Sequence, residues 1–316
     1  MYFWCGLPLN PIVQDAKGFR DEMTRYKQVV PRDVVAIKYQ CILNFLGRSR
    51  DPLQLVGLGV DEEALMKSAL TSRTFWVAQH IRLMRVVLAY HLGDASMAWE
   101  RAGEFIDNDT DAWGVEYMTG PICFILSLSA MGVMKEKRNR QVERKSFKYI
   151  QKVASWASKG EVNATHLNLI LLAEKAAISK GKYEIVKDAY DTAITSAARG
   201  GFLQNAALTC ERMAEFLLSR GKKDRAEDYL VRSYELYQEW GAVAKLKQLR
   251  FKYRLFDSSV IEDRRGTSRY GYERFSLASG DMHRRSASFG EFEESDTDIL
   301  GLSSGHIHSS EERNGT

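Results

Sequence analysis

The chain has 316 residues, of which 45% are hydrophobic and 27% are charged, a composition that is ordinary for a soluble globular protein. Its most apolar run, residues 121–134, is too short to span a bilayer and predicts a buried helix, so no membrane association is expected. Four scattered cysteines without a CxxC pair are typical of reduced thiols, which predicts a cytoplasmic location.

The first sixty residues are predicted to contain two helices and a loop. Residues 2–9 are apolar and carry no helix-start pattern, so we expect an exposed end that needs a cap. Helices are predicted over residues 11–30 and 31–46, each with a proline in its first turn. Residues 51–60 are rich in Pro and Gly and predict a loop.

Helical spacing of apolar residues continues through the middle of the chain. Asp61, Glu62 and Glu63 predict the first turn of a helix, where the helix dipole favours carboxylates. Further helices are predicted over residues 74–92 and 111–134, and Asn163 is the predicted N-cap of a later one. Between them, four apolar residues are predicted to face the core: Phe147, Ile150, Val153 and Trp156. Strand patterns are absent from the first 256 residues, so the predicted class is all-α.

Two consecutive helical hairpins over residues 181–256 have nearly the same layout. In each, a turn glycine is followed at +5, +9 and +12 by residues suited to one closely packed face. These are Val186, Tyr190 and Ala193 after Gly181, and Ala226, Leu230 and Ser233 after Gly221. Gly93, followed by Ala98 and Ala102, begins a third, degenerate copy. Gly181 and Gly221 are forty residues apart, and a fixed period of 20 to 50 residues predicts a helical-hairpin solenoid, here over residues 1–256.

The composition changes after residue 256. Residues 257–316 contain 7 basic and 12 acidic residues and few aliphatic ones, so they cannot bury enough apolar area to offset the entropy of ordering. A disordered tail is predicted. Thr267 and Ser288 follow paired arginines and Ser295 precedes acidic residues, so these three are candidate phosphorylation sites.

No nucleotide or nucleic-acid site is predicted. Gly181-Lys182 and Gly221-Lys222 lack the second glycine and the hydroxyl residue of a phosphate-binding loop. The basic residues of 135–148 are expected to form a solvated helix face, because the neighbouring aromatic residues follow the core period.

No catalytic, cofactor or metal site is predicted either. His80, His91 and His166 are each isolated within a helical segment and are expected to be structural. No Ser or Cys has a base and an orienting acid in a recognisable arrangement. The sequence therefore predicts a protein that is not an enzyme and has no small-molecule substrate.

Seven groups of residues follow one another in an order that matches a known helical region: Tyr2-Phe3, Gly6 and Pro8-Leu9; Asp51-Pro52, Leu55 and Gly57; Asp61-Glu62-Glu63; Asn163, His166 and Ala173-Glu174; Tyr190-Asp191 and Ala193-Ile194; Gly201-Phe202 and Ala207-Leu208; and Trp240-Gly241-Ala242 with Ala244-Lys245. In this respect the chain resembles the tetratricopeptide-like region of multi-domain AAA/STAND-type ATPase sensor kinases, both histidine and serine/threonine kinases. The resemblance implies a tetratricopeptide-like fold that transmits a binding event to neighbouring domains. The family's catalytic residues lie in domains without a counterpart here, so none is carried over.

The predicted function is therefore a non-enzymatic protein-interaction and signal-transduction module. Its concave helical face would bind a peptide or a neighbouring domain, as stacked helical hairpins do. The alternative is a truncated fragment of a large ATP-dependent sensor kinase whose catalytic domains are missing here.

Overall fold

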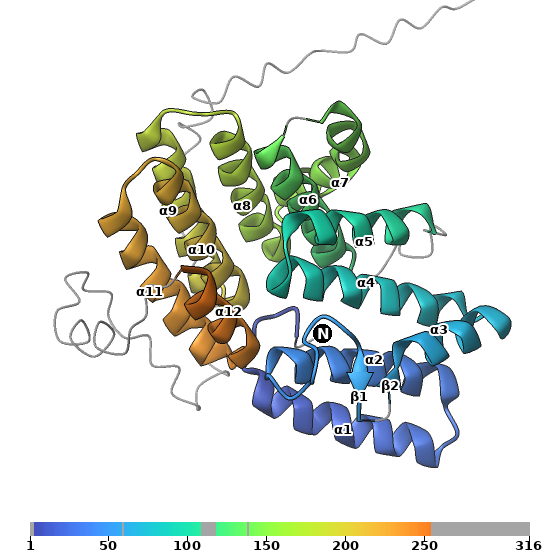
Figure 1. Cartoon of the computed structure of the whole chain (residues 1–316). Coiled ribbons are helices and arrows are strands. Elements are labelled where there is room, and N and C mark those ends of the chain that lie inside the picture. The colour runs from blue at the N-terminus through green and yellow to red at the C-terminus, as the bar shows by residue number, and fades with distance from the viewer. Residues whose placement is uncertain (1–2, 59, 109–117, 138, 254–316) are drawn as a thin grey trace, which may run out of the picture. The chain divides into compact units, whose positions relative to one another are not determined.

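The computed structural model describes residues 3–58, 60–108, 118–137 and 139–253. Over these residues the chain forms twelve α-helices and one pair of two-residue strands, which confirms the predicted all-α class (Figure 1). The predicted disordered tail, with Thr267, Ser288 and Ser295, lies outside the described residues. Within the described part, no helix combines the length and the apolar character needed to cross a bilayer.

The elements follow one another with short connections. They are α1 (Leu9–Arg25), α2 (Val29–Phe45), β1 (Val56–Gly57), β2 (Val60–Asp61), α3 (Glu62–Thr71), α4 (Phe75–Leu92), α5 (Ala95–Asp107), α6 (Thr119–Glu136), α7 (Arg140–Ser158), α8 (Val162–Ile178), α9 (Tyr183–Arg199), α10 (Leu203–Ser219), α11 (Lys223–Trp240) and α12 (Val243–Tyr253). The strands pair antiparallel, Val56 with Asp61 and Gly57 with Val60. So short a pair carries no sequence pattern, and the prediction of a loop over residues 51–60 missed it.

Local sequence rules account for several helix starts and for one misplaced end. Glu62 and Glu63 lie in the first turn of α3, as the acidic triplet predicted, whereas Asp61 caps the helix. The Asp61 carboxylate accepts the backbone N–H groups of Glu63 and Ala64, each at 3.0 Å. The first helix ends at Arg25 rather than at residue 30, because Lys27 adopts a left-handed conformation with φ 56° that a helix cannot continue.

The predictions about α7 and α8 were each wrong in one residue. Of the four residues of α7 predicted to face the core, Val153 is fully buried, and Ile150 and Trp156 are half-buried and pack against the core, whereas Phe147 is 59% exposed. The buried residues of α7 are Val142, Ser146, Tyr149 and Val153. The small Ser146 is fully buried on α7, which packs against α6, and a small side chain suits close packing of two helices better than a large one would. Helix α8 begins at Val162 after Glu161, so Asn163 lies inside its first turn rather than at the cap.

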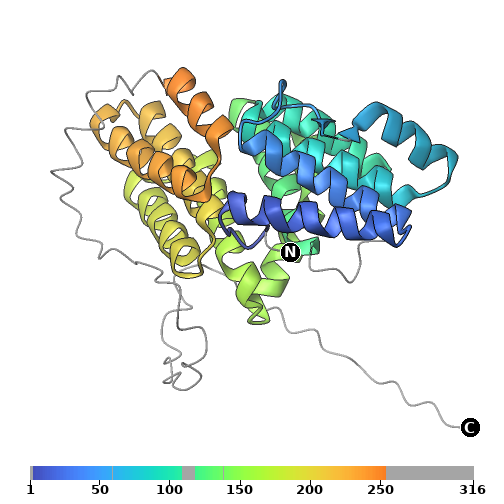
Figure 2. The same ribbon diagram turned by 90° about the horizontal axis from the view of Figure 1, so that it is seen from below.

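The helices pack as hairpins in which α4 pairs with α5, α6 with α7, α8 with α9, and α10 with α11 (Figures 1 and 2). The even-numbered helices of successive hairpins also touch, since α4 contacts α6, α6 contacts α8, and α8 contacts α10. The residues predicted at the close contacts are all fully buried: Ala98, Ala102, Val186, Tyr190, Ala193, Ala226, Leu230 and Ser233. The glycine-spaced pattern therefore does identify packed faces.

The two ends of the helical region meet in the interior. Helix α12 contacts α2 and α4. The Phe3 ring packs against Phe45 and Trp240, with its centroid 5.9 Å from each, and Leu9 is fully buried. The expectation of an exposed apolar end over residues 2–9 was therefore wrong for Phe3 and Leu9, although Leu7 is 44% exposed. Phe3 is covered by residues that are distant in the sequence.

Candidate functional site

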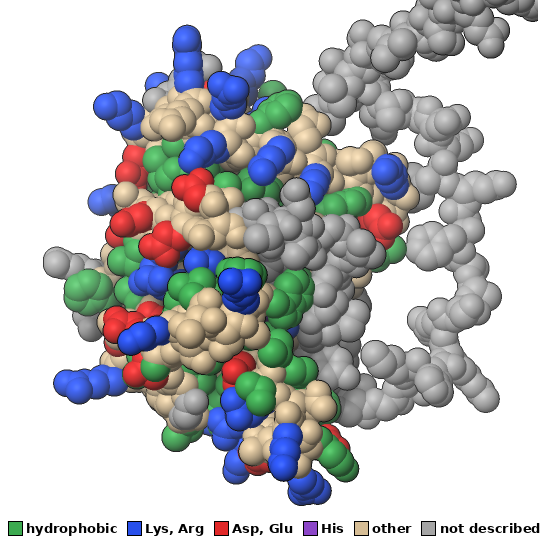
Figure 3. All heavy atoms as spheres, turned by 90° about the vertical axis from the view of Figure 1, so that its right-hand side faces the viewer, with side chains coloured by type: hydrophobic (Ala, Val, Ile, Leu, Met, Phe, Trp, Pro, Cys, Tyr) green, Lys and Arg blue, Asp and Glu red, His purple; other side chains and the backbone are tan. Residues whose placement is uncertain are grey.

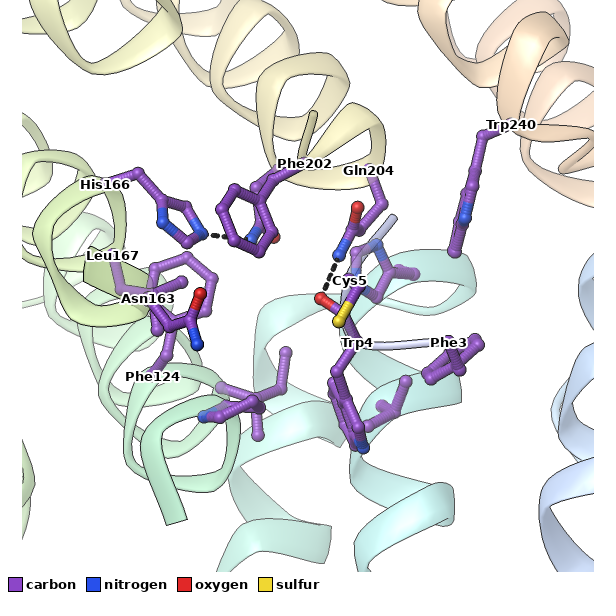
Figure 4. Close-up of a pocket in the computed structure, with 15 residues that line it drawn as sticks. Phe3, Trp4, Cys5, Phe124, Asn163, His166, Leu167, Phe202, Gln204 and Trp240 are labelled. Atoms are coloured by element: carbon purple, nitrogen blue, oxygen red, sulfur yellow. Dashed lines mark hydrogen bonds between the residues drawn. The ribbon is translucent and has the colours of Figure 1, made fainter. Parts of the chain in front are cut away.

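A cavity of about 130 Å³ lies where the N-terminal segment meets the even-numbered helices, and we call it the central cavity (Figure 4). It is lined by Phe3, Trp4, Cys5, Val87, His91, Pro121, Phe124, Ile125, Asn163, His166, Leu167, Phe202, Gln204, Asn205 and Trp240. None of these is Asp, Glu, Lys or Arg, and aromatic rings predominate. Asn163 is exposed, so the cavity reaches solvent at the start of α8.

One wall of the cavity is the non-helical segment of residues 3–7, which we call the N-terminal segment. The Gln204 side-chain amide donates a hydrogen bond to the Trp4 carbonyl oxygen at 2.8 Å, which ties the segment to the start of α10. Gly6 has φ 79°, and a Cβ there would lie 2.7 Å from the backbone nitrogen of Leu203 and 2.9 Å from the Phe202 Cα. The segment is therefore seated closely against α10, at a point where only glycine fits.

Gly6→Ala is expected to weaken the packing of the N-terminal segment against α10 and to destabilise the protein. The added methyl group meets backbone atoms that cannot move aside, and the left-handed conformation is unfavourable for alanine, with a combined cost of about 1–3 kcal/mol. Thermal unfolding and hydrogen exchange at residues 3–7 measure the effect. The matched control is Gly18→Ala, where a Cβ meets nothing within 4 Å and the helix favours alanine. Equal stability of the two variants would contradict the close seating.

Two buried histidines form part of the cavity wall. The His166 ring stacks on Phe202, with centroids 3.8 Å apart, and its Nε2 lies 3.0 Å from the Asn205 side-chain nitrogen. Because an amide nitrogen only donates, Nε2 accepts and the ring proton lies on Nδ1. Burial lowers the pKa of His166 to about 4. Burial and the nearby charge of Lys245 lower the pKa of His91 to about 3. Both rings are therefore neutral at neutral pH.

Four polar atoms of the cavity wall have no hydrogen-bond partner among the described residues. They are His91 Nδ1, His166 Nδ1, Gln204 Oε1 and Trp240 Nε1, and each side chain is less than 8% exposed. An unpaired buried polar atom costs about 1–3 kcal/mol, so folded proteins keep few of them. Four such atoms around one cavity distinguish this place from an ordinary core.

A second polar group, which we call the ionic cluster, joins α6, α8, α10 and α12. It consists of Lys135, Glu174, Glu211, Arg212, Glu215, Lys245 and Lys252. Arg212 binds the fully buried Glu174 through two nitrogens, at 2.9 and 3.0 Å, and Tyr190 donates to the same carboxylate at 2.9 Å. Burial alone would raise the pKa of Glu174, but the charges of Arg212 and Lys135 outweigh it and hold that pKa below its usual value.

The ionic cluster fastens α12 to the rest of the helices. Lys245 is 3% exposed, and its ammonium group donates to the His91 carbonyl oxygen at 2.7 Å and pairs with Glu211 at 3.0 Å. Lys252 pairs with Glu215 at 2.7 Å. The buried charges thus compensate one another, which indicates a structural role in holding α12 against the other helices.

The structure brings together residues that the sequence presented as separate. His91 and His166 share the central cavity, whereas His80 lies apart and its Nδ1 is 2.9 Å from the Trp76 carbonyl oxygen. Sequence reasoning missed Gln204 as a cavity residue. Phe202 and Trp240 line the central cavity and also belong to the stretches that carry the family resemblance. That resemblance was the one signal in the sequence that could have indicated the cavity.

The other sequence-based candidates have ordinary surroundings. Cys41, Cys123 and Cys210 are buried free thiols, and Cys5 is a half-buried free thiol. Gly181 and Gly221 lie in the turns before α9 and α11. Among the described residues, no group of three or more His, Cys, Asp or Glu side chains is placed to hold a metal ion. On the face in Figure 3, Lys and Arg side chains are interspersed with acidic and apolar ones.

Comparisons with protein-family models, with curated proteins and with solved structures found no match for this chain. Its function is therefore inferred from residues and geometry alone.

Proposed function

We propose that the helical region is a tetratricopeptide-like solenoid that serves as a non-enzymatic protein-interaction and signal-transduction module. The binding face would be the one to which α4, α6, α8 and α10 contribute, and its ligand would be a peptide or a neighbouring domain. The hairpin pairing and the buried glycine-spaced residues support the repeat architecture. The free thiols favour a reducing, cytoplasmic location.

One observation carries this proposal: residues of α2, α10 and α11 already hold a non-helical peptide segment of the same chain. Gln204 binds the main chain at Trp4, and the Phe3 ring lies beside Phe45 and Trp240. Peptide recognition commonly combines main-chain hydrogen bonds with pockets for side chains. The N-terminal segment thus illustrates how this face would hold a partner.

The polar groups of the interior favour a binding module over an enzyme. The buried carboxylates Glu174 and Glu211 are engaged in ion pairs with Arg212 and Lys245. The cavity histidines are neutral, and no carboxylate lines the cavity beside them. ATP hydrolysis by the purified full-length chain, abolished by a substitution within that chain, would overturn this part of the proposal.

Peptide binding can be tested with a displayed random-peptide library panned on the full chain. Affinities of selected peptides would be measured by fluorescence anisotropy. Asn163→Trp places a bulky ring on the exposed rim of the central cavity and is expected to weaken binding at least about tenfold, roughly 1.4 kcal/mol. The control is Ile185→Trp on α9, which is 61% exposed and does not line the cavity. Failure to select any peptide, or equal loss in both variants, would refute the proposed face.

A further inference from the structure

The proposed peptide binding leaves the central cavity itself unexplained. A face that binds only peptides has no need of four unpaired polar atoms buried around one small space. These atoms belong to cavity-lining side chains of four separate helices, α4, α8, α10 and α11. Since each unpaired atom destabilises the fold, four of them on side chains that line one cavity indicate a ligand that pairs with them.

We propose that the central cavity binds a small, uncharged, single-ring aromatic molecule that carries a hydrogen-bond donor and a hydrogen-bond acceptor. This ligand site shares its rim residue Asn163 with the proposed peptide-binding face, and it departs from the sequence-based expectation of no small-molecule ligand.

The size of the cavity limits the ligand to one ring. Its volume of about 130 Å³ is close to that of an apolar cavity of about 150 Å³ that takes up benzene. A nucleoside or a dinucleotide is therefore too large. Asn163, at the start of α8, both lines the cavity and is exposed, so it marks the rim (Figure 4).

The lining favours an aromatic ligand. The rings of Phe3, Trp4, Phe124, Phe202 and Trp240 surround the space. Aromatic rings prefer offset-stacked or edge-to-face arrangements with one another, so a planar ring finds complementary partners here on several sides. A saturated ring of the same size would gain only the burial of its surface.

The electrostatics favour an uncharged ligand with hydrogen-bonding groups. No charged side chain lines the cavity, and burial keeps His91 and His166 neutral. An ionic ligand would lose its hydration without gaining a counter-charge in the wall. The unpaired groups include N–H donors on Trp240 and His166 and an acceptor oxygen on Gln204. A hydroxyl or an amide on the ring can match both kinds.

Phenol is the probe that tests this assignment on the full chain at neutral pH. Titration calorimetry should give a dissociation constant at least tenfold lower than that of benzene, which lacks hydrogen-bonding groups, or of cyclohexanol, which lacks the aromatic ring. Benzoate, an anion of similar size, should not bind. Phenol should also raise the thermal midpoint as its concentration increases, because binding to the folded state alone stabilises it.

Variants locate the site. His166→Phe keeps a ring that can stack on Phe202 and removes both ring nitrogens, the unpaired Nδ1 donor and the Nε2 that accepts from Asn205, so phenol affinity should fall at least tenfold. The control is His80→Phe, a buried histidine on α4 that does not line the cavity and should leave the affinity unchanged. Leu167→Phe, which fills the cavity without removing a polar group, should also abolish binding and serves as the second test if His166→Phe does not fold.

Two outcomes would overturn the assignment. One is that no probe binds at millimolar concentration, which would mean that water occupies the cavity. The other is that phenol binds equally well to the cavity variants and to His80→Phe, which would place binding elsewhere. Neither outcome bears on selection of peptides by the same chain, so the two proposals fail independently.

Discussion

Arg212→Met is expected to destabilise the folded protein by about 3–5 kcal/mol, the usual cost of leaving a buried charge unpaired. The variant removes both Arg212 bonds to Glu174, whose side chain is fully buried, and leaves that carboxylate with Tyr190 as its remaining hydrogen-bond donor. It also removes the contact with Glu215 at 2.9 Å. The free energy of unfolding from urea titration is the measurement.

The matched control for this prediction is a surface ion pair. Lys187 and Asp191 lie one helical turn apart on α9 at 2.7 Å, and both side chains are about one-third exposed. Lys187→Met should cost about 0.2–1 kcal/mol, because water screens exposed pairs. Adding Glu174→Gln to Arg212→Met should recover part of the loss, since the unpaired charge is then gone. A cost below about 1 kcal/mol for Arg212→Met would contradict the assignment of the ionic cluster as a structural fastening.

The second large effect is a loss of stability in mild acid. His80, His91 and His166 are buried, and burial lowers their pKa values to about 4, 3 and 4 respectively. An unfolded histidine has a pKa of about 6.5, so below that pH the unfolded state binds more protons than the folded state, and stability falls. Each histidine should remove about 2 kcal/mol between pH 6.5 and 5.

Three such groups together should cost about 6 kcal/mol by pH 5, which is comparable with the total stability of many domains. The ionic cluster acts in a lower window, because the pKa of Glu174 is depressed and its contribution is lost only below about pH 4.5. Unfolding free energies measured at several pH values should therefore fall with a slope near three protons. His166→Gln, which cannot titrate, should reduce that slope by about one proton. A flat profile from pH 7 to 5 would contradict the neutral burial of these rings.

Much of the helical framework was predictable because helices carry their information locally. The acidic triplet at residues 61–63 marks the start of α3, and Gly93 marks the end of α4, because capping involves residues within one turn. The apolar run of residues 121–134 lies in the buried helix α6 for the same reason. The glycine-spaced positions after Gly181 and Gly221 are buried because they recur on one helix face.

The predictions from the sequence were wrong where two overlapping sets of residues could form the buried face of a helix, or where residues distant in the sequence cover a segment. On α7, two overlapping apolar faces are compatible with the sequence, and packing with a buried Ser146 decides between them. At the N-terminus, residues 3–9 looked like an exposed end because the cover of Phe3 comes from Phe45 and Trp240. No local period can indicate a partner more than 200 residues away.

The sequence by itself determined the helical class, most helix boundaries and the repeated close-packing positions, because these depend on residues within a few turns of one another. Only the tertiary structure decided that Phe3 is covered, that His91 and His166 share a cavity, and that Lys245 fastens α12 to α4 and α10. Those contacts depend on the angles between successive hairpins. Each angle is set by side-chain packing along a whole interface, and small differences accumulate over the array. The hydrogen bond between the Gln204 side chain and the Trp4 carbonyl oxygen depends on the angles of all the hairpins that separate these two residues along the chain.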